Sequence, residues 1–461
     1  MREAAATVAR LAAAFEEIGV DEGARIAVIG ANSPWHYIVH VATSWLRAVT
    51  VPLSPRMPSP ALTSMCEQVG VSWVFLDEAS SRTHAPALSD ASAQVASFAD
   101  LSAWADRAAP IGHPPARCGT ELAAILFTSG STGIPRPVEL THEVMWWGST
   151  NFREGFDYAP TSSVVGVCAP TSHIGGFNGT SMDTWTHGGT LVTLGFPGSF
   201  DARGVIDAIE RYGITMMFAV PAIVRAILDE HERGGGDLSS WVRPLIGGDA
   251  MTADLTDAMR TVGLSPIHVW GMTETSGAGT VATPDSGAPA GSLGVPFPYV
   301  DLRLMATDER EAGVGELGQI WVRGPGVVSG DEWLRTGDLA TKDEDGWLHM
   351  VGRAHRMINT GGELVAPPTV ERALRSLDEV SDALVVGLPD ERWGQIVAAL
   401  IVPSPEGRAQ ASSMSTEALS EALSDAQAPW EKVRRVLIVD ALPTTTTGKP
   451  DPVAAARLFD S

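Results

Sequence analysis

Residues 126–136 read Leu-Phe-Thr-Ser-Gly-Ser-Thr-Gly-Ile-Pro-Arg, and this stretch decides how the rest of the chain is interpreted. It continues an apolar, strand-like run at 123–127 and brings together glycines, small hydroxyl residues, a proline and a cation. Glycine lets backbone N–H groups approach an anion closely, and the hydroxyls add further donors. The segment therefore predicts a loop around phosphate oxygens, with Arg136 as the charge partner. A plain Ser/Gly turn is the alternative that this loop alone leaves open.

Two common phosphate-binding motifs do not fit the loop. A Walker loop needs G-x-x-x-x-G-K-[ST], whereas Gly130 and Gly133 are three apart and no Gly-Lys-Ser/Thr follows. The dinucleotide pattern G-x-G-x-x-G is also absent from this turn. The segment instead resembles the signature loop T-S-G-[ST]-T-G-x-P-K-G of the adenylate-forming superfamily. That group includes acyl- and aryl-CoA ligases, luciferases and the adenylation domains of peptide synthetases.

Further segments resemble motifs of the same family, in the family's order. They are Pro-Thr-Ser-His-Ile-Gly-Gly at 170–176, Gly-Gly-Asp-Ala at 247–250, Trp-Gly-Met-Thr-Glu at 270–274, Thr-Gly-Asp at 336–338, Gly-Arg at 352–353, and Leu-Pro to Gly-Lys at 442–449. Because these matches span nearly the whole chain, it is identified as a member of the superfamily, closest in motifs to the acyl-CoA ligases.

Composition agrees with a cytoplasmic enzyme that has a large core. The 461 residues are 44% hydrophobic, and three cysteines are too few and too scattered for a disulfide framework or a zinc site. The net charge of −23 argues against non-specific nucleic-acid binding. No stretch approaches the ~20 apolar residues of a membrane span, and the N-terminus lacks the features of a signal peptide.

The pattern of elements predicts an α/β fold in two domains. Strand-like runs at 123–127, 163–168, 189–194, 215–220, 243–246 and 266–270 alternate with helical stretches such as 201–212 and 221–231. Such alternation predicts a large domain, 1–354, of helix-covered, mostly parallel sheets. After about residue 300 short strands and turns dominate, and a helix is expected near 416–426. The resemblance implies that 355–461 form a small, mobile α+β domain.

The resemblance implies a two-step reaction. A carboxylate is a poor electrophile, so it first attacks the α-phosphorus of ATP to give an acyl-adenylate, with Mg²⁺ bridging the phosphates. The thiol of coenzyme A then attacks the acyl carbonyl and releases AMP. Ligands in parallel sheets bind at the carboxyl ends of strands. The phosphate loop, His173, Gly247 and the 270–274 motif all follow predicted strands, so we expect them in one cleft.

Site residues follow from the resemblance, position by position. Those expected to bind the nucleotide are Thr128, Ser129, Gly130, Ser131, Thr132, Gly133, Arg136, Gly248, Asp249, Ala250, Trp270, Gly271, Thr273, Asp338 and Arg353. Those expected to act in catalysis are Lys449, His173, Thr273 and Glu274, with Glu274 also the Mg²⁺ ligand. Those expected around the acyl group are His173, Gly175, Phe177, Gly247 and Met272, a mixture that suits an apolar or aromatic acid.

Three positions are expected to serve the thiol step. Gly361 and Gly362 would line a tunnel for the pantetheine arm of CoA, because a Cβ there would obstruct it. Trp393 would pack near CoA, although a place in the core is an equally good interpretation. His355 occupies the hinge position between the two domains. A carrier protein in place of CoA, and assembly as a homodimer, are left open by the sequence.

Departures from the family pattern leave two alternatives to a full ligase. Arg136-Pro137 replaces Lys-Gly in the phosphate loop, His355-Arg356 replaces the usual hinge pair, and Thr369 stands where Glu is usual. The family's first N-terminal stretch is also missing. One alternative is a specialised enzyme that mainly converts a supplied acyl-adenylate to the thioester. The other is a catalytically silent nucleotide-binding protein, which the presence of Glu274 and Lys449 disfavours. A peptide-synthetase module is disfavoured because no carrier domain follows.

Overall fold

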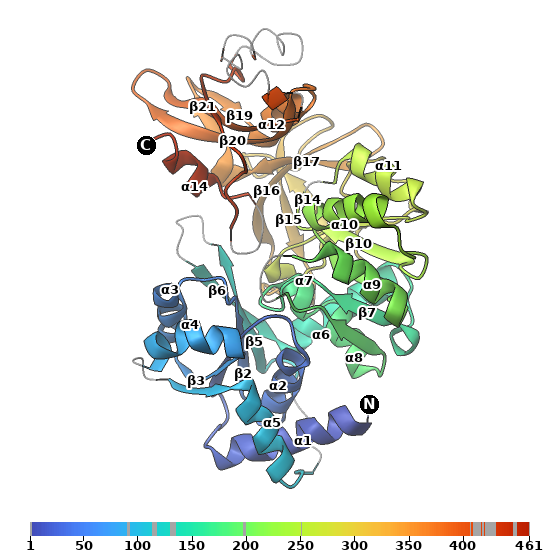
Figure 1. Ribbon diagram of the computed structural model, residues 1–461. Coiled ribbons are helices and arrows are strands. Elements are labelled where there is room, and N and C mark those ends of the chain that lie inside the picture. The colour runs from blue at the N-terminus through green and yellow to red at the C-terminus, as the bar shows by residue number, and fades with distance from the viewer. Residues whose placement is uncertain are drawn as a thin grey trace. The chain divides into compact units, whose positions relative to one another are not determined.

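The computed structural model describes residues 2–89, 93–112, 118–129, 135–196, 200–249, 251–405, 407–408, 416, 419, 430–445 and 450–460. The chain forms two compact units. The first comprises Met1–Leu302 and Val322–Leu334, and the second comprises Arg303–Trp321 and Arg335–Ser461. Each unit is described by itself (Figure 1).

The first sheet of the large unit has the order β4-β3-β1-β2-β5-β6. Its strands are β1 (Arg25–Ile29), β2 (Val49–Leu53), β3 (Val71–Leu76), β4 (Gln94–Ser97), β5 (Leu122–Ser129) and β6 (Pro135–Thr141). Neighbouring strands run parallel except β5 and β6, which pair antiparallel. β6 is the last strand in this order and is therefore an edge strand, where a sheet tolerates proline.

Helices cover both faces of this sheet. They are α1 (Arg2–Glu17), α2 (Pro34–Trp45), α3 (Ser59–Val69), α4 (Glu78–Ser89) and α5 (Phe98–Arg107). Leu11 and Phe15 of α1 pack with Val39 of α2 and Leu101 of α5 in one buried cluster. A second cluster contains apolar residues of α3 and α4. Apolar side chains on each face of the sheet therefore pack against a layer of helices, as buried parallel strands require.

The second sheet has the order β13-β12-β11-β10-β9-β7-β8. Its strands are β7 (Val164–Val167), β8 (Thr190–Thr193), β9 (Met216–Ala219), β10 (Arg243–Gly247), β11 (Ile267–Trp270), β12 (Thr280–Ala282) and β13 (Val295–Pro296). The run from β8 to β11 is parallel, and β12 and β13 pair antiparallel. The helices are α6 (His142–Gly155), α7 (Ile174–Phe177), α8 (Thr180–Thr186), α9 (Ala202–Tyr212), α10 (Pro221–Gly234) and α11 (Ala253–Thr261).

Two buried clusters connect these elements. Ile206 of α9, Ile227 of α10 and Leu255 of α11 pack with Ile246 of β10, so these three helices share one face of the second sheet (Figure 1). Apolar residues of β5, β6, α6 and α7 form a further cluster. The segment that carries α7 is therefore packed against the first sheet as well as belonging to the second.

The second unit is built mainly from antiparallel strands. β14 (Asp301–Met305), β15 (Gly318–Arg323), β16 (Leu334–Lys342) and β17 (Leu348–Arg353) form one sheet in that order. β18 (Ile358–Thr360), β19 (Glu363–Val365), β20 (Val380–Asp390), β21 (Gly394–Pro403) and β22 (Arg435–Ile438) form another, with α12 (Pro367–Arg375) and α14 (Pro452–Arg457). α12 and α14 contribute to separate buried clusters, because successive residues of β20 face opposite sides.

The predicted fold class is confirmed. Each expected strand between 123 and 270 coincides with an observed one, and the two expected helices are α9 and α10. The helix expected near 416–426 falls almost entirely outside the described residues. None of the described helices is long and apolar enough to cross a membrane.

Candidate functional site

The predicted phosphate loop is the connection between β5 and β6. Thr128 pairs with Arg136 in the antiparallel register, and the Thr128 hydroxyl donates to the Arg136 carbonyl at 3.4 Å. Gly130, Ser131, Thr132 and Gly133 lie outside the described residues, and for Ser129 only the backbone is described. Arg136 is exposed and is the second residue of the edge strand β6. Pro137 is compatible with this strand because β6 has a partner on one side only.

The second sheet brings several predicted residues to one edge. β7, β9, β10 and β11 are parallel neighbours, and His173, Gly247 and Trp270 lie at or just after the carboxyl ends of three of them. Gly247 is the last residue of β10, and Gly248 continues the chain with φ +81°. Asp249 is exposed, and Ala250 lies outside the described residues. This edge is where parallel sheets place ligands.

Phe218, which the sequence analysis did not single out, lies against two of the residues predicted to surround the acyl group. It lies on β9 and is half-buried. A Cβ built on Gly175 would lie 2.6 Å from Phe218 Cε1, and one built on Gly247 would lie 3.1 Å from Phe218 Cε2. The phenyl ring therefore contacts two of the predicted acyl-pocket glycines. Phe177, in contrast, is completely buried and packs in the cluster formed by β5, β6 and α6.

The 270–274 motif forms a tight turn whose backbone folds back on itself. A Cβ on Gly271 would lie 2.1 Å from the Gly277 carbonyl oxygen, so this position requires glycine. Trp270 and Thr273 are buried, with 7% and 5% of their surface exposed, and Met272 is half-buried. The sequence thus places an aromatic ring, a hydroxyl and a carboxylate within five consecutive residues at the end of β11.

Glu274 has an orphaned buried oxygen. Its Oε2 atom is buried and has no hydrogen-bond partner. A buried carboxylate oxygen without a partner is unfavourable unless a ligand satisfies it. Mg²⁺ takes one or two protein carboxylates and completes its shell with phosphate and water oxygens. Among the described residues no cluster of three or more His, Cys, Asp or Glu side chains could hold a metal. The single carboxylate fits Mg²⁺ held jointly with a nucleotide.

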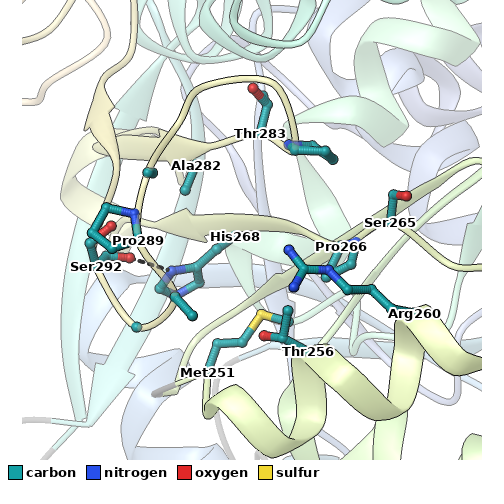
Figure 2. Close-up of a pocket in the computed structure, with 14 residues that line it drawn as sticks. Met251, Thr256, Arg260, Ser265, Pro266, His268, Ala282, Thr283, Pro289 and Ser292 are labelled. Atoms are coloured by element: carbon teal, nitrogen blue, oxygen red, sulfur yellow. Dashed lines mark hydrogen bonds between the residues drawn. The ribbon is translucent and has the colours of Figure 1, made fainter.

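A small cavity of about 90 Å³ lies between α11 and the beginning of β11 (Figure 2). Figure 2 shows His268 of β11 with Met251 and Ser292 around it, and its Nδ1 lies 3.1 Å from the Ser292 carbonyl oxygen. Burial lowers the pKa of His268, so its imidazole is neutral near pH 7. None of the predicted site residues lines this cavity, although Met251 follows Ala250 and His268 stands two residues before Trp270.

The predicted ribose pair lies in the second unit. Asp338 of β16 and Arg353 of β17 are register partners, and Arg353 Nε lies 2.9 Å from Asp338 Oδ1. Asp338 is 3% exposed. Its backbone N–H donates to the Thr336 hydroxyl at 3.1 Å, and that hydroxyl donates to the Ile320 carbonyl at 2.7 Å. The Thr-Gly-Asp turn is therefore anchored to β15 through its threonine.

The two tunnel glycines behave differently. Both have left-handed φ values, +66° for Gly361 and +94° for Gly362. A Cβ on Gly361 would lie 2.6 Å from Trp393 Cε3, whereas one on Gly362 would meet nothing within 4 Å. The Gly361 N–H also donates to the Trp393 carbonyl at 2.8 Å. Packing therefore explains Gly361, but it leaves Gly362 without a steric reason inside this unit.

Two arginine side chains stack on the Trp393 ring, which the sequence analysis did not anticipate. The guanidinium carbons of Arg392 and Arg434 lie 4.8 and 4.9 Å from the centre of the Trp393 ring system. Both arginines are exposed, and Trp393 is half-buried. The indole thus holds two positive charges close to Gly361 and Gly362, an arrangement suited to an anionic ligand.

The hinge segment has its own ion pairs. His355 lies in the turn after β17, and partial burial of its ring, together with the neighbouring positive charges of Arg353 and Arg356, lowers its pKa. Arg356 lies 3.7 Å from the buried Glu371 carboxylate, which also accepts from the Val385 N–H at 3.0 Å. The unusual Arg356 therefore has an acidic partner on α12, two residues beyond Thr369. Lys449 lies outside the described residues.

Family models match most of the chain. The AMP-binding enzyme family matches residues 1–330, and the AMP-binding enzyme C-terminal domain matches residues 369–449. A feruloyl-CoA synthase from an Amycolatopsis species is 32% identical over 96% of this chain and 90% of its own length. An indoleacetate–CoA ligase from Aromatoleum aromaticum is 28% identical over the same shares of the two chains.

Solved structures share the fold at lower identity. MatB from Rhodopseudomonas palustris, with ATP bound, has a TM-score of 0.87 at 23% identity and covers 100% of this chain and 93% of its own. The anthranilate CoA ligase AuaEII, in complex with anthranoyl-AMP, has a TM-score of 0.86 at 20% identity, with 100% and 92% coverage.

Proposed function

This chain belongs to the AMP-binding enzyme family, and we propose that it joins an apolar or aromatic carboxylic acid to coenzyme A. It is an ATP-dependent acid–thiol ligase that passes through an acyl-adenylate, with ATP, Mg²⁺ and CoA as its nucleotide, metal and acceptor. The buried, unpartnered oxygen of Glu274 is the observation that carries the nucleotide half of the proposal, because it requires a cation or a donor.

We assign the first step to groups that follow β5 and β11, together with Lys449 and the ribose pair Asp338 and Arg353. Thr128, Arg136 and the undescribed residues between them bind the β- and γ-phosphates, and Thr273 donates to the α-phosphate. Bound Mg²⁺ would be held by Glu274 and would neutralise phosphate charge. The acid carboxylate then attacks the α-phosphorus and pyrophosphate leaves. Lys449 offsets the charge that develops at the α-phosphate, and Asp338 and Arg353 bind the ribose.

The acid-binding space supports the choice of an apolar or aromatic acid. Phe218 contacts Gly175 and Gly247, and no described side chain among these three residues is charged. The Phe218 ring lies directly against both glycines, so the three residues together present an apolar, partly aromatic surface, which suits an apolar or aromatic acid. The feruloyl-CoA synthase and the indoleacetate–CoA ligase carry aromatic acids in their names, which favours the same class here.

We assign the thioester step to the second unit. Gly362 keeps a path free for the pantetheine arm, and Trp393 with its two arginines binds anionic groups of CoA. The CoA thiol attacks the acyl carbonyl and AMP leaves. We place the boundary between residues 1–354 and a mobile domain 355–461, with His355 at the turning point. A fatty acid–[acyl-carrier-protein] ligase from Streptomyces coeruleorubidus, 27% identical, makes a carrier protein the second candidate acceptor.

The cellular setting is also part of the proposal. Cys66, Cys118 and Cys168 are free thiols, which suits the reducing cytoplasm. A homodimer is the proposed assembly, and light scattering of the purified protein tests it.

The experiment that tests the function measures the two half-reactions separately. Ferulate, indoleacetate and anthranilate are offered with ATP and Mg²⁺, and acid-dependent pyrophosphate release is followed. Acyl-adenylates of the same acids are then offered with CoA, and thioester is measured. Both activities are expected for a full ligase. Thioester formation from supplied adenylate, with no pyrophosphate release from any acid, would identify the one-step alternative. Failure of both would contradict the proposal.

A further inference from the structure

Asn32 ties the carboxyl end of one sheet to that of the other. It lies in the loop between β1 and α2 of the first sheet. Its Nδ2 donates to the Val167 carbonyl at 3.0 Å and to the Ala169 carbonyl at 2.8 Å, and its Oδ1 accepts from the Thr171 N–H at 3.0 Å. One side chain thus satisfies three backbone groups in the segment that leads from β7 to His173.

The loop that carries Asn32 is itself held in place. Asp77 accepts from the Ala31 N–H at 2.8 Å and from the Ser80 N–H at 2.7 Å. A Cβ on Gly30 would lie 2.9 Å from Asp77 Oδ2, so the loop lies directly against this carboxylate. The backbone that carries Asn32 is therefore held by Asp77, the residue directly before α4.

A second contact holds the other end of the same turn. The buried Tyr37 hydroxyl donates to the Gly176 carbonyl, and the Tyr37 ring stacks on Phe177 with centroids 6.5 Å apart. A Cβ on Gly176 would lie 2.5 Å from the Ala169 carbonyl oxygen, which is the atom that accepts from Asn32. The backbone of the turn 168–177 therefore packs against itself. Asn32, just before α2, binds its first half, and Tyr37, within α2, binds its last residues.

The position of this turn sets the space beside Phe218. Gly175 lies in the turn, and its missing Cβ is what lets the Phe218 ring approach. The Cys168 thiol at the start of the turn also donates to the Phe218 carbonyl at 3.2 Å. A shift of the turn would consequently move His173 and Gly175 relative to Phe218 and Gly247.

We propose that Asn32 and Tyr37 are positioning residues that fix the turn 168–177 and thereby set the dimensions of the acid-binding space. The proposal rests on the function assigned above, because that function places the acid beside His173 and Gly175. Neither residue touches the acid. They act through the backbone of the turn, so their loss should weaken recognition of the acid more than recognition of ATP.

Two variants test the proposal. Asn32→Asp keeps the acceptor for Thr171 but replaces the donor to Val167 and Ala169 with a carboxylate oxygen. Tyr37→Phe removes one hydroxyl and keeps the ring on Phe177. The matched control is Tyr158→Phe, which removes a buried hydroxyl that donates to Asp183 Oδ2 at 2.7 Å outside the turn. Acid and ATP KM values are measured by pyrophosphate release, and amide hydrogen exchange is followed in peptides covering 168–177.

In both test variants we expect exchange in 168–177 to quicken by about fivefold to a hundredfold, the range that one lost buried hydrogen bond produces. The acid KM should rise by at least about fivefold, with the ATP KM within about twofold of wild type. Tyr158→Phe should change neither. General destabilisation would lower apparent kcat for every substrate without this split.

Unchanged exchange in both variants, or faster exchange with an unchanged acid KM, would overturn the proposal. If the wild-type protein releases no pyrophosphate with any acid, the assigned function fails. The exchange measurement would then still decide whether Asn32 and Tyr37 hold the turn, because it needs no substrate.

Discussion

Asp338 and Arg353 face each other across two antiparallel strands, with Arg353 Nε 2.9 Å from Asp338 Oδ1. The aspartate is 3% exposed, and half of the arginine side chain is accessible. The pair therefore presents a buried carboxylate whose orientation is fixed by a cross-strand cation. Such a carboxylate can accept hydrogen bonds from two neighbouring hydroxyls, as the assignment to ribose requires.

Asp338→Ala should weaken the use of ATP and of acyl-adenylate by about 1.5–3 kcal/mol, as for lost hydrogen bonds to a charged group. The measurement is kcat/KM for ATP and for a supplied adenylate. Arg335→Ala is the matched control, because Arg335 lies on the same strand and pairs with the exposed Glu309 at 2.7 Å. Unchanged constants in Asp338→Ala would remove this residue from the nucleotide site.

Glu274→Gln should separate stability from function. Neutralising a carboxylate whose Oε2 atom is buried without a partner should raise the free energy of unfolding of the ligand-free protein by about 1–2 kcal/mol. The same change should abolish the rise in Tm that Mg²⁺ with ATP gives the wild type, because the metal loses its protein ligand. Denaturant titration and thermal melts with and without Mg²⁺ and ATP measure both effects. Glu332→Gln, an exposed residue of the same unit, is the control. A variant that still gains Tm from Mg²⁺ with ATP would contradict the assignment.

Two buried histidines predict that acid destabilises the protein. Burial lowers the pKa of His36 to about 4 and that of His40 to about 3, from an ordinary value near 6.5. Between pH 6.5 and each lowered pKa, the histidines take up protons in the unfolded chain but not in the folded one. The free energy of unfolding is therefore greatest above pH 6.5 and falls as the pH decreases. The loss should be about 1–2 kcal/mol per histidine between pH 6.5 and 5.

Urea titrations over this pH range measure the effect. His40→Gln should flatten the dependence, because the glutamine binds no proton in either state. Equal slopes for the wild type and His40→Gln would show that His40 is not neutralised by burial.

The sequence predicted the parts of the site that rest on strand ends. Gly247 and Trp270 could be placed at one edge because parallel neighbours end together, and the alternation of strands and helices is visible in the hydrophobic pattern. Positions that depend on register were less accessible. The motifs assign Asp338 and Arg353 to one ribose, but only the pairing of β16 with β17 makes them direct partners.

Residues that act across sheets could not be predicted in this way. Asn32 and Tyr37 precede the signature loop by about a hundred positions in a stretch that reads as a helix start, and no local pattern links them to the turn 168–177. Phe218 was missed for a related reason. In a buried strand it has the signal of a core residue, and its contact with Gly175 and Gly247 follows from the absence of two Cβ atoms.

Gly362→Leu should block the thioester step and leave adenylate formation intact. A Cβ at this position would meet nothing within 4 Å, so we expect the effect of the leucine to come from the path of the pantetheine arm. A left-handed φ at a non-glycine residue has its own cost of about 1–3 kcal/mol. Gly346→Leu controls for this strain, because Gly346 has φ +90° and also faces open space. Normal CoA turnover in Gly362→Leu would show that the tunnel lies elsewhere.

Arg434→Ala should weaken the binding of CoA, because it removes a positive charge that lies over the Trp393 ring. Arg392 and Arg434 lie 4.8 and 4.9 Å from the centre of this indole, so two positive charges stand close together and favour an anionic ligand. If the pair binds the 3′-phosphate of CoA, the wild type should prefer CoA to dephospho-CoA, and Arg434→Ala should lose that preference by about 1–2 kcal/mol, as for a charge-assisted hydrogen bond. KM values for both thiols, with a supplied adenylate, measure the difference.

Arg372→Ala, which changes an exposed arginine of α12, should retain the wild-type preference. An equal loss with both thiols in Arg434→Ala would assign this arginine to the pyrophosphate of CoA, and no loss with either would remove the Trp393 cluster from the CoA site.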